Sequence, residues 1–256
     1  PWIHGNFVSI CGNTQGFSAL DIYGKITCIG GVSSTNTNNH PSSGGFIQIK
    51  QTNNAFSALN RDGSVVSWRS VTDGNPEYEH GPPEGNDTIA IYSTQGAFIS
   101  LKRDGSIYTW GKPHQGGPYA SSSDYSSISS DPPSTSETGF VSITTSENSA
   151  IAIKEDGSLV GWGYDREWGG SKITDTTKYK KLPTIFGSGT GKRISKLVAN
   201  DKAFCALTID GKLYTWGGHN HYNSWHGRYE NYGGNEYNGN LSIGDAKWVD
   251  IFSCGS

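Results

Sequence analysis

The sequence predicts an all-β fold, a β-propeller in which one repeated unit forms each blade. Three observations carry this prediction: a unit of about 24 residues occurs five times, it contains a glycine-centred turn, and it ends near a recurrent tryptophan. Successive turn glycines are 39, 42, 52 and 54 residues apart, which is a repeat length typical of propeller blades. The turn glycines are Gly24, Gly63, Gly105, Gly157 and Gly211.

The composition agrees with many short strands joined by turns. Only 33% of the 256 residues are hydrophobic and 17% are charged, whereas 35 are glycine. Aromatic residues reach 12%, which is more than a disordered chain would carry. We therefore expect a single propeller domain over residues 1–256.

Each unit is expected to form three strands. In the second unit these are "FIQI", "AFSAL" and "SVVSW", three runs rich in β-branched and aromatic residues. All variation in length falls between one unit and the next. The expected repeats are residues 7–45, 46–88, 89–139, 140–193 and 194–247, with a partial repeat at 248–256.

The second and third strands are linked by turn chemistry such as "RDGS" and "EDGS". Glycine adopts positive φ at little cost and aspartate tolerates the interior of a turn, so the pair favours a tight hairpin. Asp62, Asp104, Asp156 and Asp210 repeat at this position, which indicates a structural role. In the first unit Tyr23 stands in place of the aspartate, but Gly24 remains.

A tryptophan recurs near the end of the third strand, and we expect it to pack between blades. The apolar pattern of "AFSAL" indicates strands that are covered on both faces, as radial blades are. Ile29 takes the tryptophan position in the first unit, which indicates that apolar packing is what the position requires. A solenoid is the alternative architecture. The tryptophans are Trp68, Trp110, Trp162 and Trp216.

The stretches "AFISLKRDGSIYTWG" and "AIAIKEDGSLVGWG" resemble the regulator of chromosome condensation (RCC-type) repeat. The variant with "YST" before "AF" resembles copies in large, mostly uncharacterised bacterial and protist proteins. The resemblance covers about half of the chain and implies a propeller, which in this family usually has seven blades. It also implies regulation of nucleotide exchange on a small GTPase as one possible function.

Charge and hydropathy bear on the partners. The net charge is −3 and the densest basic cluster is Lys178, Lys180 and Lys181, so nucleic acid is not expected as a partner. No apolar run approaches the ~20 residues that span a membrane, so membrane insertion is not expected. The chain begins at Pro1 and contains no methionine, which indicates a processed chain or a piece of a longer one. Low charge and abundant Ser, Thr and Asn favour an extracellular location.

The four cysteines are Cys11, Cys28, Cys205 and Cys254, and no two form a CxxC pair. Cys205 lies inside a strand pattern and is interpreted as a buried small residue. A disulfide between Cys11 and Cys28 is left open, because spacing alone does not establish one. Glycosylation sequons begin at Asn86 and Asn240, both in the segments between units.

The inserts between units are the variable part, and loops on a rigid scaffold commonly carry function. The last insert, "HNHYNSWHGRYENYGGNEYNGNL", is rich in aromatic and amide side chains. It is interpreted as an irregular packed loop or as a contact surface for protein or glycan. Its histidines, His219, His221 and His226, lack repeated carboxylates beside them, so no metal is expected. The candidate binding residues are Tyr222, Trp225, Tyr229, Tyr232 and Tyr237.

No catalytic site and no cofactor are expected. The stretch "GSGTGKR" resembles a phosphate loop, but Phe186 occupies its first glycine position and Arg193 replaces the hydroxyl residue. It is interpreted as a solvated turn before a strand. The chain is thus expected to be a non-enzymatic binding or structural scaffold for a protein partner. A carbohydrate-binding propeller is the alternative, and an exchange regulator is a third.

Overall fold

The computed structural model describes residues 6–14, 16–30, 41–69, 81–112, 115–118, 129–164, 186–187, 189–190, 192–218, 221–223, 228–230 and 247–253. These residues form five antiparallel sheets and one separate hairpin, and they contain no α-helix. The all-β propeller architecture expected from the repeats is confirmed.

Four of the sheets have three strands, and consecutive strands pair in chain order. The first sheet consists of β1 (Phe7–Asn13), β2 (Gly16–Asp21) and β3 (Ile26–Gly30). The second consists of β4 (Phe46–Gln51), β5 (Ala55–Asn60) and β6 (Val65–Arg69). The third consists of β7 (Thr88–Ser93), β8 (Ala97–Lys102) and β9 (Ile107–Gly111). The fifth consists of β14 (Ile194–Ala199), β15 (Ala203–Thr208) and β16 (Leu213–Gly217).

The fourth sheet has an extra strand that the repeat pattern does not contain. Its core is β11 (Phe140–Thr145), β12 (Ser149–Lys154) and β13 (Leu159–Tyr164). The short strand β10 (Ser129–Ser130), which comes from the preceding insert, pairs with β13 at the outer edge. The unit itself forms the three strands that the sequence predicts, and the insert before it adds the fourth. The third unit begins one residue earlier than expected, at Thr88.

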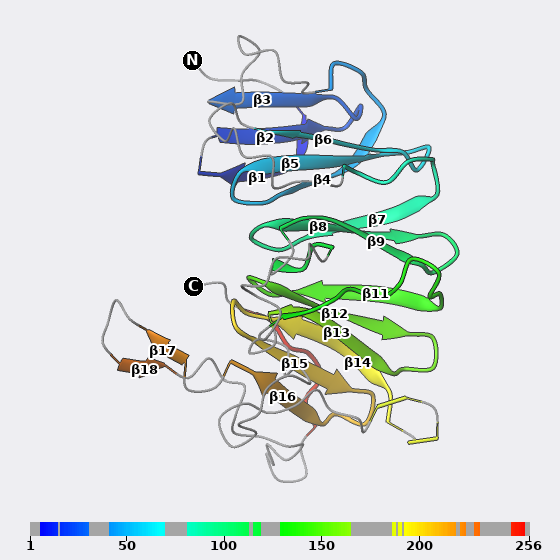
Figure 1. Cartoon of the computed structure of the whole chain (residues 1–256), viewed down its shortest axis with the longest axis vertical. Coiled ribbons are helices and arrows are strands. Elements are labelled where there is room, and N and C mark those ends of the chain that lie inside the picture. Colours follow the sequence, from blue (N-terminus) through cyan, green and yellow to red (C-terminus); the bar gives the residue numbers. More distant parts are fainter. Residues whose placement is uncertain are drawn as a thin grey trace.

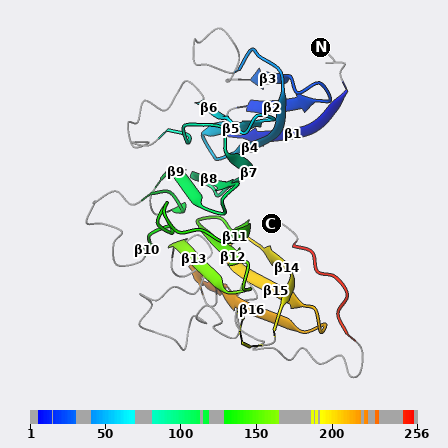
Figure 2. The same ribbon diagram turned by 90° about the vertical axis from the view of Figure 1, so that its right-hand side faces the viewer.

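The sheets are stacked along an arc, with the first and last at opposite ends (Figures 1 and 2). The first strand of each sheet contacts the first strand of the next, so β1, β4, β7, β11 and β14 line the inner side of the arc. Each of these strands shifts register by a bulge after its first residue. The described residues do not close a ring.

Each recurrent tryptophan is buried between two sheets. Their exposed fractions are 3% for Trp68 and Trp110 and 0% for Trp162 and Trp216. The indole nitrogen of Trp110 donates to Ser67 Oγ of the preceding sheet at 3.2 Å, and that of Trp162 donates to the carbonyl oxygen of Gly116 at 3.0 Å. In the apolar clusters, Trp68 lies with Leu20, Trp110 with Leu59, Trp162 with Leu101 and Trp216 with Ile151.

All five turn glycines have positive φ, between 77° and 92°. In the second, third and fourth turns the aspartate accepts from the backbone and the side chain of the serine two positions on; Asp62 Oδ1, for example, accepts from Ser64 N and Ser64 Oγ. In the fifth turn Asp210 Oδ1 accepts from Thr208 Oγ1 instead, and the backbone nitrogen of Lys212 donates to Thr208 Oγ1. The first turn, which lacks this aspartate, uses Asp21 instead. Its Oδ1 accepts from the backbone nitrogens of Tyr23 and Lys25.

Residues 247–253 begin a further repeat unit but form no strand. The backbone nitrogen of Trp248 donates to the carbonyl oxygen of Gly211 at 3.3 Å, the bond that a first-strand residue makes to the preceding turn. Lys196 Nζ pairs with Asp250 at 2.7 Å and lies over the ring of Phe252. The segment thus lies beside the fifth sheet where the first strand of a further unit would begin.

We predict that alanine is tolerated far less at Gly63 than at Gly157. Both positions have positive φ, but a Cβ at Gly63 would overlap the carbonyl oxygen of Asn86, whereas the nearest atom to one at Gly157 is 3.7 Å away. Gly157→Ala should cost about 1–2 kcal/mol of unfolding free energy, and Gly63→Ala about 2–4 kcal/mol. Urea denaturation measures both. Equal losses would show that contact with the next repeat plays no part.

Candidate functional site

The turns that join the first and second strands lie at the same end of the strands in every sheet. We call this side of the molecule the turn face and define it by the second residue of each turn: Thr14, Asn53, Gln95, Glu147 and Asp201. The turns that contain Asp-Gly lie at the opposite end of the strands. Because the strands are antiparallel, each third strand ends beside the turn face again.

The first residue of each of these turns is serine, threonine or asparagine, and its side chain closes the turn from within. Thr94 Oγ1 accepts from the backbone nitrogen of Ala97 at 2.9 Å, and Asn200 Oδ1 accepts from that of Ala203 at 2.8 Å. Thr52 makes the equivalent bond at 3.1 Å. This is the local side chain to backbone bonding that these residue types favour in turns. In the "YST" variant, the threonine has this role.

The second residues of the turns are joined to one another by a chain of hydrogen bonds that crosses four inter-sheet junctions. The backbone nitrogen of Asn53 donates to Gln95 O at 2.8 Å, that of Gln95 to Glu147 O at 2.7 Å, and that of Glu147 to Asp201 O at 3.0 Å. At the first junction Thr14 Oγ1 donates to Asn53 O at 3.0 Å. The turn face is therefore a continuous hydrogen-bonded row, with backbone bonds at three junctions and a side-chain bond at the first.

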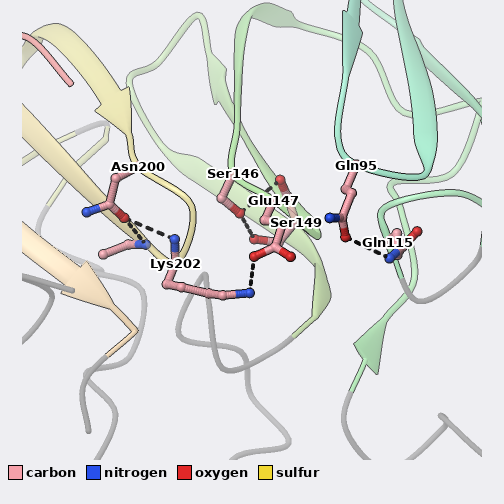
Figure 3. Close-up of polar contacts among 8 residues, drawn as sticks. Gln95, Gln115, Ser146, Glu147, Ser149, Asn200 and Lys202 are labelled. Atoms are coloured by element: carbon pink, nitrogen blue, oxygen red, sulfur yellow. Dashed lines mark hydrogen bonds and ion pairs between the residues drawn. The ribbon is translucent and has the colours of Figure 1, made fainter. Parts of the chain in front are cut away.

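The side chains of this row are polar, and Figure 3 shows two of them, Gln95 and Glu147, with their neighbours. Lys202 pairs with Glu147 across the junction between the fourth and fifth sheets, and Gln115 Nε2 donates to Gln95 Oε1 at 3.4 Å. Thr14 and Asn53 are exposed, and the other members of the row are half-buried. The row offers amide, hydroxyl and carboxylate groups for hydrogen bonding, with a positive and a negative charge already paired.

The inserts start at the turn face. The backbone nitrogen of Lys112, at the start of the third insert, donates to Gly96 O, and that of Tyr164 donates to Asn148 O. Gln115 lies three residues after Lys112, and its carbonyl oxygen accepts from Thr94 Oγ1 of the third turn. Variable segments and fixed turns therefore share this end of the molecule.

The last insert contains a hairpin that the sequence did not predict, β17 (His221–Asn223) and β18 (Arg228–Glu230). It stands apart from the five sheets (Figure 1). Tyr222 is opposite Tyr229 in its register, so two of the five candidate binding residues are brought together. Trp225, Tyr232 and Tyr237 lie outside the described residues, as do His219 and His226.

A cavity of about 550 Å³ opens at the opposite end, between the fourth and fifth sheets. Gly24, Gly63, Gly105 and Gly211 each accept from the first-strand residue that follows, but no such bond joins Gly157 and Ile194 among the described residues. The stretch singled out as a solvated turn lies here and is followed by a strand, as expected. Lys154, Glu155, Asp156, Lys192 and Arg193 line the cavity, so charges of both signs face it.

The cysteines do not form a disulfide in the described part of the chain, where Cys11, Cys28 and Cys205 are free. Cys11 and Cys28 flank Ser18 in one row across three strands, which separates their Cα atoms by about 10 Å. A disulfide needs less than about 7 Å. Burial raises the pKa of the Cys11 thiol to about 12 and that of Cys205 to about 11. Cys205 is half-buried, so the expectation of full burial is wrong, and Cys254 lies outside the described residues.

The remaining sequence features add no site in the part of the chain that the structure describes. No group of three or more His, Cys, Asp or Glu residues there could hold a metal ion. Nor do those residues include an apolar helix long enough to cross a membrane. Asn86 of the first sequon is exposed, and Asn240 lies outside the described residues.

No known family model matches the sequence, and no curated protein matches it. Solved structures do resemble it. Prp20, the yeast RCC1 crystallised with Kap60, is 17% identical with a TM-score of 0.56; the match covers 82% of this chain and 56% of Prp20. Human WBSCR16 is 14% identical with a TM-score of 0.55 and coverage of 83% and 62%. The ectodomain of the Physcomitrella patens receptor kinase CR4 is 18% identical with a TM-score of 0.50 and coverage of 82% and 52%.

The chain has an RCC1-like blade fold. At these identities the likeness extends to the fold alone. The chain spans about half to three fifths of the length of the solved chains that it resembles.

We predict that the turn aspartates make the protein acid-sensitive. The Ser hydroxyl bonds lower the pKa of Asp62, Asp104 and Asp156 below the ordinary value. A lowered pKa in the folded state contributes stability above the unfolded value of about 3.9, and this is lost as the pH falls through the folded value. Urea midpoints should therefore drop as the pH falls below about 4.

The triple variant Asp62→Asn, Asp104→Asn, Asp156→Asn should flatten this pH dependence. The matching serine variants, Ser64→Ala, Ser106→Ala and Ser158→Ala, should flatten it as well, because they remove the hydroxyl donors that lower the pKa values. An unchanged acid slope in both triple variants would contradict the assignment.

Proposed function

We propose that this protein is a non-enzymatic propeller scaffold that binds a protein partner through the turn face and the inserts that start beside it. The observation that carries the proposal is the continuous row from Thr14 to Asp201, which fixes polar side chains from five sheets at one end. Binding residues on loops held by a rigid scaffold are the common arrangement in proteins.

The solved structures give this proposal a precedent. Prp20 is described as binding Gsp1p and histones, and in another crystal it is bound to Kap60. One protein with this blade fold is therefore described as binding other proteins. A hydrogen-bonding face with few unpaired charges suits a protein surface better than it suits nucleic acid, which needs a basic footprint.

Site-specific photocrosslinking in the native cell tests the proposal. Benzoylphenylalanine replaces Asn53 on the turn face, or Arg61 at the other end of strand β5 as a matched control; both residues are exposed. We expect a discrete covalent adduct with another protein from position 53 and none from position 61. Equal adducts from both ends, or none from either, would contradict the proposal.

A second variant tests whether the side chains of the row make the contact. Gln95→Ala removes an amide from the turn face but retains the backbone bonds that Gln95 makes to its neighbours. It should lower the adduct yield at position 53 several-fold without changing the unfolding midpoint. An unchanged yield would place the contact outside the row.

Carbohydrate binding is the second candidate, and the pairing of Tyr222 with Tyr229 in a projecting hairpin favours it. Aromatic rings suit stacking on sugar faces. A glycan array should then show binding that Tyr229→Ala reduces at least about tenfold. An array without a bound glycan would remove this candidate.

The likeness to Prp20 also motivates the third class, regulation of nucleotide exchange. A direct assay separates it from plain binding: the protein is added to a small GTPase that is loaded with a fluorescent nucleotide. We expect no acceleration of nucleotide release, and acceleration would replace the scaffold proposal with an exchange function.

A further inference from the structure

The junction between the fourth and fifth sheets lacks a hydrogen bond that the other turn glycines make at the Asp-Gly end. Elsewhere, the turn glycine accepts from the first residue of the next unit at 3.0 to 3.3 Å. Within the described residues Gly157 and Ile194 do not form this bond, and both line the cavity of about 550 Å³ at this junction. A described sheet lies on each side, so both walls of the cavity are defined. Its volume falls within the ~300–1,000 Å³ typical of small-molecule sites.

The wall that the fourth sheet contributes offers hydrogen-bond acceptors and negative charge. Glu155 and Asp156 of its Asp-Gly turn are exposed and line the cavity beside Gly157, whose carbonyl oxygen adds a neutral acceptor. Lys154 lines the cavity as well, but its ammonium group pairs with Glu137 at 2.6 Å. This wall therefore suits a positively charged group of a ligand.

The wall on the side of the fifth sheet offers hydrogen-bond donors and positive charge. Lys192 and Arg193 directly precede β14, and neither forms an ion pair with another described residue. Lys192 Nζ lies 5.1 Å from the centre of the Tyr214 ring, which belongs to the apolar cluster that joins the two sheets. The N–H of Ile194 adds a neutral donor, because in the equivalent residues of other units this group points across the junction. This wall therefore suits a carboxylate.

We propose that this cavity binds a short peptide whose amino and carboxyl ends are both free. Its ammonium group lies at Glu155 and Asp156, and its carboxylate lies at Lys192 and Arg193. The inference does not rest on the proposed function, which concerns the turn face at the opposite end of the strands.

The two backbone groups at the junction favour a peptide over other ligands that carry both charges. A peptide group has one N–H and one C=O. It can donate to the carbonyl oxygen of Gly157 and accept from the N–H of Ile194, and so supply the bonds that these residues do not make to each other. Val141 and Ile153 add aliphatic lining for the side chains of the ligand.

Ligands with a single kind of charge fit the cavity less well. A phosphate held by Lys192 and Arg193 would face the carboxylates of the opposite wall, and a metal cation would face these two basic side chains. A ligand with both charges places each of them at the wall of opposite sign.

An NMR chemical-shift titration of the isotope-labelled chain with trialanine tests the proposal. We expect a dissociation constant between about 10 μM and 1 mM. Acetylation of the amino end of the probe removes its ammonium group, and amidation of the carboxyl end removes its carboxylate. Each change should weaken binding at least about tenfold, because it deletes a charge-assisted contact. No shift changes with trialanine up to about 10 mM, or equal affinities for the three probes, would overturn the proposal.

Two substitutions assign the ends of the ligand to the two walls. Arg193→Gln should weaken trialanine binding about three- to tenfold but leave the affinity of the amidated probe unchanged, since that probe has no carboxylate. Glu155→Gln should likewise affect trialanine but not the acetylated probe. Arg103→Gln is the matched control, because Arg103 is also exposed and lies at the same end of the third sheet. Losses that do not depend on which end is blocked contradict the assignment and overturn the proposal.

A steric pair of variants locates the ligand. Val141→Trp fills the cavity and should abolish binding, whereas Ile89→Trp, at the same position of the third sheet, should not. Both native side chains are 50% exposed, so the urea midpoints of the two variants should stay close to each other. Binding that survives Val141→Trp overturns the proposal, because the ligand would then lie elsewhere.

Discussion

The row of backbone hydrogen bonds between neighbouring hairpin turns fixes how the sheets sit on one another. Apolar packing alone is non-directional and would allow one sheet to slide over the next. The bonds from Asn53 to Gln95, from Gln95 to Glu147 and from Glu147 to Asp201 set both the spacing and the height of the sheets. They can form because the preceding Ser, Thr or Asn side chain closes each turn and leaves the next peptide group free to bond sideways.

At the Asp-Gly end a second set of hydrogen bonds joins neighbouring sheets, but the fourth and fifth sheets lack this bond within the described residues. Four turn glycines accept from the residue that starts the next first strand, and Gly157 does not do so within the described residues. A Cβ at Gly157 would accordingly meet no atom closer than 3.7 Å, although one at Gly105 would meet Gly139 at 2.8 Å. The cavity lies at this same junction. The turn row at the other end remains continuous, so the two sheets stay joined there.

The repeated parts of the fold could be predicted from the sequence because their chemistry is local. Gly63 and Asp62 define a turn, and Trp68 signals a covered face, whatever the rest of the chain does. The parts that do not repeat could not be predicted in this way. β10 forms only because the folded chain brings residues 129–130 beside β13. The hairpin of Tyr222 and Tyr229 lies in a polar insert whose sequence has no strand periodicity. The sequence analysis did not predict the row of hydrogen-bonded turns. Its signal was present, since a Ser, Thr or Asn stands at the first turn position in all five units. The hydrogen bonds between the turns become visible only when the neighbouring sheets are placed.

The same row explains how one repeat can be both a rigid unit and a variable surface. At the second position of the turns the chain carries Thr, Asn, Gln, Glu and Asp in successive units, whereas the capping position before it is restricted to three residue types. In four of the five units the backbone of the second residue, and not its side chain, makes the contact that holds the sheets together. The side chain can therefore change without loss of the fold. A position whose peptide group makes the structural contact is free to vary in its side chain, and the scaffold presents four such positions in one line.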